Sequence, residues 1–246
     1  MTSYLLYAIL GIAPSVIWLL FYLHKDVNPE PKKTVLLIFL GGALMGPAAL
    51  LLQIAALAVL SPQAQWSNIF AAVNQNHYFF LFNILIFAPI SEEVVKYLPV
   101  RYLALKKPDF DEPLDAMIYL IISALGFAAT ENLLNIFLIP ELTLQLALSQ
   151  AVVRFLSATF LHALVSGILG YFIASALLNF KKRRLIFTIG FLFAFALHGL
   201  YNYLAWLFNS DKIFALAIAG LLVIMAGLVS WQFRYLKKQL SVCKIR

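Results

Sequence analysis

The stretch PISEEVVK, residues 89–96, places three charged side chains inside a run of apolar residues long enough to cross a membrane. A charged side chain at the centre of a membrane helix costs roughly 2.5–3.5 kcal/mol on insertion scales. Such residues are retained when they pair with one another, line a cavity that contains water, or take part in chemistry. The function of the chain therefore depends on what Glu92, Glu93 and Lys96 do.

The composition around this stretch is that of a membrane protein with several spans. Of the 246 residues, 63% are hydrophobic and 12% are charged, against about 45–50% and 25% in soluble domains. The net charge of +7 does not indicate a nucleic-acid partner, because the basic residues lie in short loops between apolar runs. The single cysteine, Cys243, excludes an internal disulfide and a cysteine-rich metal site.

Seven apolar runs are each long enough to cross roughly 30 Å of hydrocarbon as a helix. They lie near residues 4–23, 34–60, 78–100, 114–137, 148–178, 185–207 and 213–233. The first run lacks the basic segment of a secretory signal, so we expect it to be retained as a span. The sequence thus predicts an all-α polytopic membrane bundle of about seven helices, with residues 1–246 as a single transmembrane domain in contact with the lipid bilayer.

The loops between these runs alternate in charge. Fifteen of the eighteen Lys and Arg residues lie in the loops at 25–33, 101–107 and 181–184 or in the tail after residue 233. The positive-inside rule makes this side cytoplasmic, with the N-terminus outside and the C-terminus in the cytoplasm. The loop at 61–77 has no Lys or Arg, and we expect it to be an interfacial loop rather than an amphipathic lid.

The third span has two glutamates that are not equivalent on a helix. Glu92 and Lys96 are one turn apart with the acid first, the favourable order for an ion pair. Glu93 points about 100° away, so one glutamate can pair with Lys96 while the other has a different task. Pro89 leaves the Leu85 carbonyl without its helical partner, which predicts a kink beside the acids. A buried ion pair that only stabilises packing is the alternative.

Three further spans have polar residues within their apolar runs. Glu131 lies in the fourth span, His162 in the fifth, and His198 in the sixth, one turn before Asn202. As structural alternatives, Glu131 could reach water at the outer interface, and each histidine could be a hydrogen-bonded packing residue. Glu92 and His162 are expected near the midplane of the membrane, and Glu131 and His198 in its outer half. These levels differ by roughly 10 Å at 1.5 Å per residue, an offset that helix tilt would have to absorb.

This set of side chains is suited to hydrolysis. Two imidazoles and one carboxylate can hold Zn²⁺ and leave a position for water, and another carboxylate can accept the proton of that water. Without a metal, a glutamate could activate water directly while His and Asn side chains stabilise an oxyanion. The spacing of the residues does not choose between these two mechanisms.

An ordered set of motifs covers residues 89 to about 202. The motifs are Glu92-Glu93-x-x-Lys96, Asp111-Glu112-Pro113-Leu114-Asp115, Gly126-Phe127-Ala128-x-x-Glu131-Asn132, Arg154 with His162-Ala163-x-x-Ser166-Gly167, and His198-Gly199-Leu200. Together they resemble the PrsW family of intramembrane proteases. That family is similar to the group of CAAX prenyl endopeptidases and bacterial Abi proteins, which also has paired glutamates and a His-x-x-x-Asn pattern. Two departures, Ala116 in place of glycine and Leu134-Asn135 in place of an aromatic residue, lie outside the site residues.

The resemblance implies an endopeptidase, usually described as a metalloprotease, embedded in a bacterial or archaeal plasma membrane. It implies a membrane-anchored protein substrate, which for some relatives is an anti-sigma factor, and a catalytic core at about 78–207. The roles expected from it are these: Glu92 or Glu93 as the base, Lys96 as its electrostatic partner, Glu131, His162 and His198 as ligands of a Zn²⁺ ion, and Asn202 as an oxyanion donor.

Two other functions remain open from the sequence. A proton- or ion-coupled transporter could use the same Glu and His side chains as a relay, although the internal symmetry common in transporters is not visible. A catalytically inactive scaffold would be favoured if the polar groups were too far apart to converge. The convergence of Glu92, Glu131, His162 and His198 in one place is therefore the observation that matters most.

Overall fold

The computed structural model describes residues 2–26, 28–60 and 76–239. The elements are, in chain order, α1 (Thr2–His24), α2 (Lys32–Leu60), α4 (His77–Phe82), the π-helix η2 (Asn83–Phe87), α5 (Ala88–Leu103), α6 (Asp115–Phe137), α7 (Leu144–Leu156), α8 (Ala158–Leu178), the 3₁₀ turn η3 (Phe180–Lys182), α9 (Arg183–Ser210) and α10 (Phe214–Leu236). Among these described residues, seven helical segments are long and apolar enough to cross a membrane, which confirms the predicted all-α bundle.

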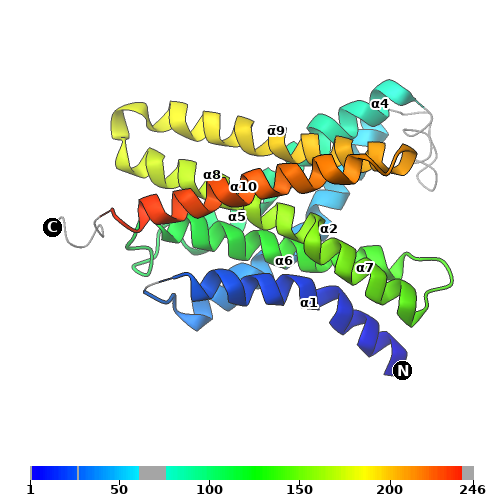
Figure 1. Cartoon of the computed structure of the whole chain (residues 1–246). Helices are drawn as coiled ribbons and strands as arrows, with labels where there is room; N and C mark the ends of the chain where they lie inside the picture. The colour runs from blue at the N-terminus through cyan, green and yellow to red at the C-terminus, as the bar shows by residue number, and fades with distance from the viewer. Residues whose placement is uncertain (1, 27, 61–75, 240–246) are drawn as a thin grey trace.

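The seven segments run up and down, so that consecutive connections alternate between the two ends of the bundle (Figure 1). The α1–α2, α5–α6 and α8–α9 connections lie at the same end as the C-terminal end of α10, and these are the basic loops. Which end faces the cytoplasm stays a prediction. A reporter fused after residue 246 that is found outside the cell would contradict it. Residues 61–75 of the loop expected at 61–77 lie outside the described residues.

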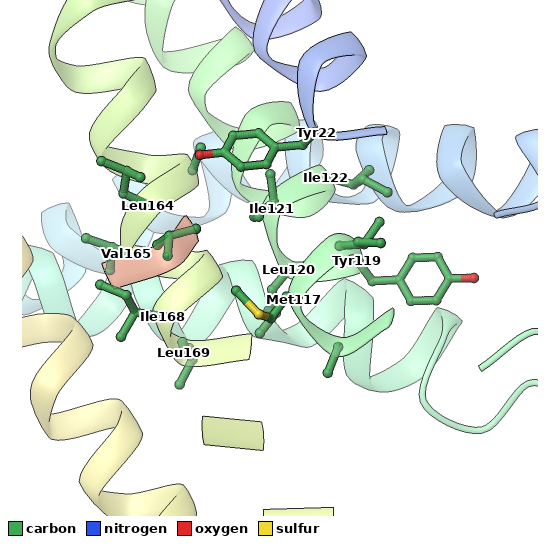
Figure 2. Packing of buried hydrophobic residues seen from close by; sticks show 14 of the residues in the cluster. Tyr22, Met117, Tyr119, Leu120, Ile121, Ile122, Leu164, Val165, Ile168 and Leu169 are labelled. Carbon is green, nitrogen blue, oxygen red and sulfur yellow. The ribbon is translucent and has the colours of Figure 1, made fainter. Parts of the chain in front are cut away.

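Helices α6 and α8 form the centre of the bundle. Most residues of both helices are buried, and α6 packs against α1, α2 and α8, whereas α8 also packs against α9 and α10. Figure 2 shows this packing from close by, with Leu120 and Ile121 of α6 beside Val165 and Ile168 of α8. The outer helices present exposed apolar side chains, as expected where the surrounding solvent is lipid.

Glycines allow the backbones of α2 and α6 to approach each other closely. A Cβ atom added at Gly126 would lie 2.0 Å from the Phe39 carbonyl oxygen, and one at Gly42 would lie 2.0 Å from the Ser123 carbonyl oxygen. Only residues without a Cβ fit at these two contacts, because close-packed interiors leave no room for the added atom. This contact places α2 directly behind the helix that contains Glu131.

The third span is irregular where Pro89 predicts it to be. The π-helix η2 lies directly before α5, because Pro89 has no N–H to donate to the preceding turn. A π-helical turn is often found at functional sites. Gly199 of α9 packs against this turn so closely that an added Cβ would lie 2.1 Å from the Leu85 carbonyl oxygen. The turn thus determines how near α9 comes to α5.

The fifth span is not the single uninterrupted helix that the sequence predicts over 148–178. It begins at Leu144 and breaks at Ser157, whose φ of −126° and ψ of −92° separate α7 from α8. Carbonyl groups near the break accept hydrogen bonds from side chains. The Ser157 hydroxyl donates to the Val153 carbonyl at 2.6 Å. The Trp18 indole N–H donates to the Phe155 carbonyl at 2.9 Å.

Candidate functional site

Polar side chains from four helices meet at one place in the bundle. They come from α5 (Glu92, Glu93 and Lys96), α6 (Glu131), α8 (His162) and α9 (His198). Glu131 Oε2 lies 2.8 Å from His162 Nε2, and Glu93 Oε1 lies 2.8 Å from His198 Nδ1. The 10 Å difference in level expected from the sequence is therefore absorbed by the arrangement of the helices, and the condition that would favour an inactive scaffold is not met.

Glu93 accepts hydrogen bonds at both of its carboxylate oxygens. Its side chain is fully buried. Oε1 accepts from Lys96 Nζ at 2.7 Å and from His198 Nδ1 at 2.8 Å, and Oε2 accepts from the Ser166 hydroxyl at 3.3 Å. A buried carboxylate is stable when it is paired and hydrogen-bonded in this way. Glu93 therefore holds three helices together as a charged structural group.

Lys96 is buried among acceptors and one aromatic ring. Its ammonium lies 2.7 Å from Glu93 Oε1, 2.8 Å from His162 Nδ1 and 3.5 Å from Glu92 Oε2, and 4.6 Å from the centroid of the Phe127 ring. The closer pair is thus with Glu93 at i, i+3, whereas the sequence favours Glu92 at i, i+4. Both spacings lie on one helix face, and the partners from α8 and α9 determine which pair is closer.

The two histidines have complementary hydrogen-bonding patterns. Lys96 can only donate, so His162 accepts at Nδ1 and donates to Glu131 from Nε2. His198 donates to Glu93 from Nδ1, which leaves its Nε2 as an acceptor. Each imidazole is thus oriented by a carboxylate on one nitrogen and presents a lone pair on the other. This is the arrangement typical of metal-ligating histidines.

Glu92 is the carboxylate with unused capacity. Its Oε2 lies 3.7 Å from His198 Nε2 and 3.5 Å from the ammonium of Lys96. That oxygen is buried and has no hydrogen-bond partner among the residues that the structure describes. The side chain as a whole retains 15% of its exposure. A buried carboxylate oxygen without a donor is costly unless water or a cation occupies the position next to it.

Arg154 and Asn132 belong to the site, although their side chains were assigned no role from the sequence. Arg154 Nη2 lies 2.8 Å from Glu131 Oε2, and its Nε donates to Asn132 Oδ1. The Asn132 amide donates in turn to the Thr159 hydroxyl at 3.0 Å. An arginine within an apolar run was the available signal. The bridge connects α7 to α6 beside His162 and leaves the Glu131 side chain 33% exposed.

A metal ion would find its donors in Glu92, His162 and His198. One ligand atom from each of these residues lies within 4.8 Å of the others, and a carboxylate with two imidazoles is a common donor set for zinc. The ligand set predicted from the sequence has Glu131 in place of Glu92. In the structure Glu131 is hydrogen-bonded to His162 Nε2, on the opposite side of the ring from Nδ1, which faces Lys96. A bound metal would require the ammonium of Lys96 to withdraw, because it lies against two of the same ligands.

Asn202 lies beside the site rather than within the charged cluster. Its side-chain amide donates to the carbonyl of Ile84 in η2 at 3.2 Å. The bond joins α9 to the π-helical turn one turn after His198. The amide thus has a positioning contact in this structure, and its expected role as an oxyanion donor stays a prediction.

Comparison with known proteins gives consistent matches. A family model described as "PrsW family intramembrane metalloprotease" matches residues 30–230. The chain is 32% identical to "Protease PrsW" of Geobacillus kaustophilus over 198 residues, which cover 79% of this chain and 77% of that protein. It is 30% identical to the protein of the same name from Oceanobacillus iheyensis, over 88% of this chain and 90% of the relative. The Bacillus subtilis protein of that name is 28% identical over 79% and 80%. No solved structure gives a significant match.

Proposed function

Because this chain belongs to the PrsW family of intramembrane proteases, we propose that Glu92 rather than Glu93 activates water for peptide hydrolysis at the cluster described above. The observation that supports this assignment is the difference between the two carboxylates. Glu93 accepts from three donors, whereas Glu92 Oε2 has none among the described residues. A general base needs a lone pair that is free to accept the proton of water.

The neighbouring side chains would move and stabilise charge during this reaction. Glu92 accepts a proton as water attacks the carbonyl carbon of the substrate, and that proton is then passed to the nitrogen of the departing amine. When no metal occupies the site, His198, with Nε2 directed to Glu92 at 3.7 Å, is placed to assist the transfer. The cations Lys96 and Arg154 supply fixed positive charge for the oxyanion, a form of stabilisation that is effective where water is excluded.

We propose that Zn²⁺, when bound, is held by His162, His198 and one oxygen of Glu92, which leaves the other Glu92 oxygen free to accept the proton of water. The metal would lower the pKa of a bound water molecule. The donor types and the carboxylate behind each imidazole fit such an ion, and the family is described as a metalloprotease family. Glu131 then acts through its hydrogen bond to His162, which holds that ring in place.

The substrate that we propose is a membrane-anchored protein in a bacterial or archaeal plasma membrane, such as an anti-sigma factor. A site within seven membrane-length helices is reached most directly by a chain that is itself in the membrane. We expect water to reach the site beside Glu131 and Glu92, whose side chains keep 33% and 15% of their exposure. The protease relatives favour this function over a transporter.

The assignment predicts different behaviour for two isosteric variants. Glu92→Gln keeps the side-chain shape and loses the base, so it should fold normally and cleave a single-span peptide about 10²–10⁴-fold more slowly. Glu93→Gln removes the charge that pairs with Lys96 in a buried site, which costs about 3–5 kcal/mol, so its melting temperature should fall. Cleavage rates and thermal unfolding in detergent measure both effects.

Glu141→Gln is the matched control, because Glu141 is an exposed residue in the α6–α7 connection. It should change neither the cleavage rate nor the melting temperature. A well-folded Glu92→Gln protein that cleaves at the wild-type rate would rule out Glu92 as the base.

A further inference from the structure

A trough of about 520 Å³ opens between α1 and α10. Its walls are formed by α1 and α10, and its floor by the end of α7 and the beginning of α8. Both α1 and α10 pack against α8. The trough thus lies between the first and last helices of the bundle. The C-terminal ends of α1 and α10 lie at the end of the bundle that has the basic loops (Figure 1).

The body of the trough is apolar and aromatic. Trp18 stacks on Phe160 with ring centroids 4.2 Å apart, and it also stacks on Phe155 at 5.2 Å. Its indole N–H is already donated to the Phe155 carbonyl, so it offers no hydrogen bond to an occupant. Along the α10 wall, Ser230 adds one hydroxyl between apolar side chains. An occupant of this part is therefore recognised by apolar contact.

One end of the trough is positively charged. Lys25 follows α1, and Arg234 and Lys237 lie at the end of α10. Lys237 donates to the Lys25 carbonyl across the gap, and the Lys25 ammonium lies 4.9 Å from the centroid of the Phe21 ring. All three residues are exposed. They lie where the spans end, which is the level of the lipid headgroups.

The size of the trough distinguishes between the apolar occupants that a membrane offers. A substrate helix of 20 residues is about 30 Å long and at least 10 Å wide, and so occupies on the order of 2,000 Å³ or more. A trough of about 520 Å³ suits an extended hydrocarbon chain better than a whole membrane helix.

We propose that this trough binds one anionic phospholipid. An acyl chain lies along Trp18, Phe155 and Phe160, and the phosphate lies against Lys25, Arg234 and Lys237. Arginine and lysine together suit a phosphate, one by its planar fork of donors and the other as a point charge. A zwitterionic lipid fits the apolar part equally well, so the three cations select for net negative charge.

The proposal has a structural consequence for the break at Ser157. The floor residues Phe155 and Phe160 flank this break, and Arg154 lies just before it. A lipid in the trough would connect α1, α8 and α10 and would cover the joint between α7 and α8. Occupancy should therefore raise the thermal stability of the whole bundle, by linkage to the folded state.

The test uses the full-length protein in detergent, titrated with phosphatidylglycerol or with phosphatidylcholine of identical acyl chains. Native mass spectrometry counts the lipids retained, and thermal unfolding measures stabilisation. We expect one phosphatidylglycerol to be retained with a preference on the order of tenfold or more, since each cation near an anionic headgroup contributes about fivefold. Replacing all three cations by glutamine should abolish the preference, and Ser230→Trp, which fills the apolar part, should reduce retention of both lipids.

The matched control is the variant Lys181→Gln/Lys182→Gln/Arg183→Gln. It removes three exposed cations elsewhere, from η3 and the first residue of α9. It should keep the preference. Equal retention of the two lipids by the wild type, or an equal loss in the control, would mean that the basic residues attract headgroups without a site. Unchanged retention in Ser230→Trp would exclude the trough even if the triple variant does not fold. Displacement of the lipid by a single-span peptide would assign the trough to substrate instead.

Discussion

At the scale of single residues, the most consequential feature is the ammonium of Lys96. It lies 2.8 Å from His162 Nδ1 and 3.5 Å from Glu92 Oε2, and both atoms belong to residues that could hold a metal. One buried cation thus occupies the position that another cation would need. The two cannot share these ligands at close range, because like charges repel strongly where water is scarce.

This competition predicts a rescue by metal. Lys96→Met leaves Glu93 unpaired in a buried site, so the metal-free protein should lose about 3–5 kcal/mol of unfolding free energy. The same change frees Glu92 and His162, so Zn²⁺ should raise the melting temperature of the variant more than that of the wild type. Thermal unfolding across a zinc titration measures this, with Lys106→Met, a change at an exposed lysine, as the control. Equal zinc effects on all three proteins would show that Lys96 does not compete with the metal.

At the scale of elements, the π-helical turn and α9 form a contact that positions His198. An added Cβ at Gly199 would lie 2.1 Å from the Leu85 carbonyl oxygen, a backbone atom that cannot rotate away. Gly199→Ala should therefore push α9 away from η2 and cost about 1–3 kcal/mol. Because His198 is the preceding residue, the cleavage rate should also fall.

Gly220→Ala is the matched control for this contact, since nothing lies within 4 Å of the Cβ that it would add. Alanine is favoured over glycine in a helix by roughly 0.5–1 kcal/mol, so this variant should be as stable as the wild type or slightly more so. Thermal unfolding and cleavage of a single-span peptide compare the two variants. A Gly199→Ala protein with wild-type rate and stability would contradict the proposed positioning of His198 by this contact.

At the scale of the whole molecule, a group in the α1–α2 connection makes stability depend on pH. Glu30 receives a hydrogen bond from the Tyr119 hydroxyl of α6. Burial, together with the nearby carboxylates of Asp115 and Asp26, raises the pKa of Glu30 from 4.5 to about 9. The folded protein therefore binds the proton of Glu30 more tightly than the unfolded chain does.

The resulting stabilisation is complete below about pH 4.5 and is lost as the pH rises through 9. Glu30→Gln has an uncharged side chain at every pH, so its unfolding free energy should decline less than that of the wild type between pH 5 and pH 9. Chemical or thermal unfolding at several pH values in this range measures the difference. Parallel declines in the two proteins would show that Glu30 does not titrate in this range.

The sequence alone determined the class of the fold. Seven apolar runs must become helices in lipid, because only then are all backbone polar groups satisfied within the segment. The sequence also identified nearly all of the candidate site residues, since charge within an apolar run is too costly to be retained without a partner or a task. The π-helical turn beside Pro89 was foreseen as a kink for a similarly local reason, the missing N–H.

The tertiary structure alone decided how these residues share their partners. Glu92 and Glu93 are neighbours of the same chemical type. Only contacts from α8 and α9 show that both oxygens of Glu93 accept hydrogen bonds, whereas Glu92 Oε2 accepts none from the described residues. The same holds for the place of Arg154 beside Glu131 and for the trough between α1 and α10. Helical periodicity states which side chains share a face of one helix, whereas hydrogen-bond partners depend on how several helices are packed, and that information is not local in the sequence.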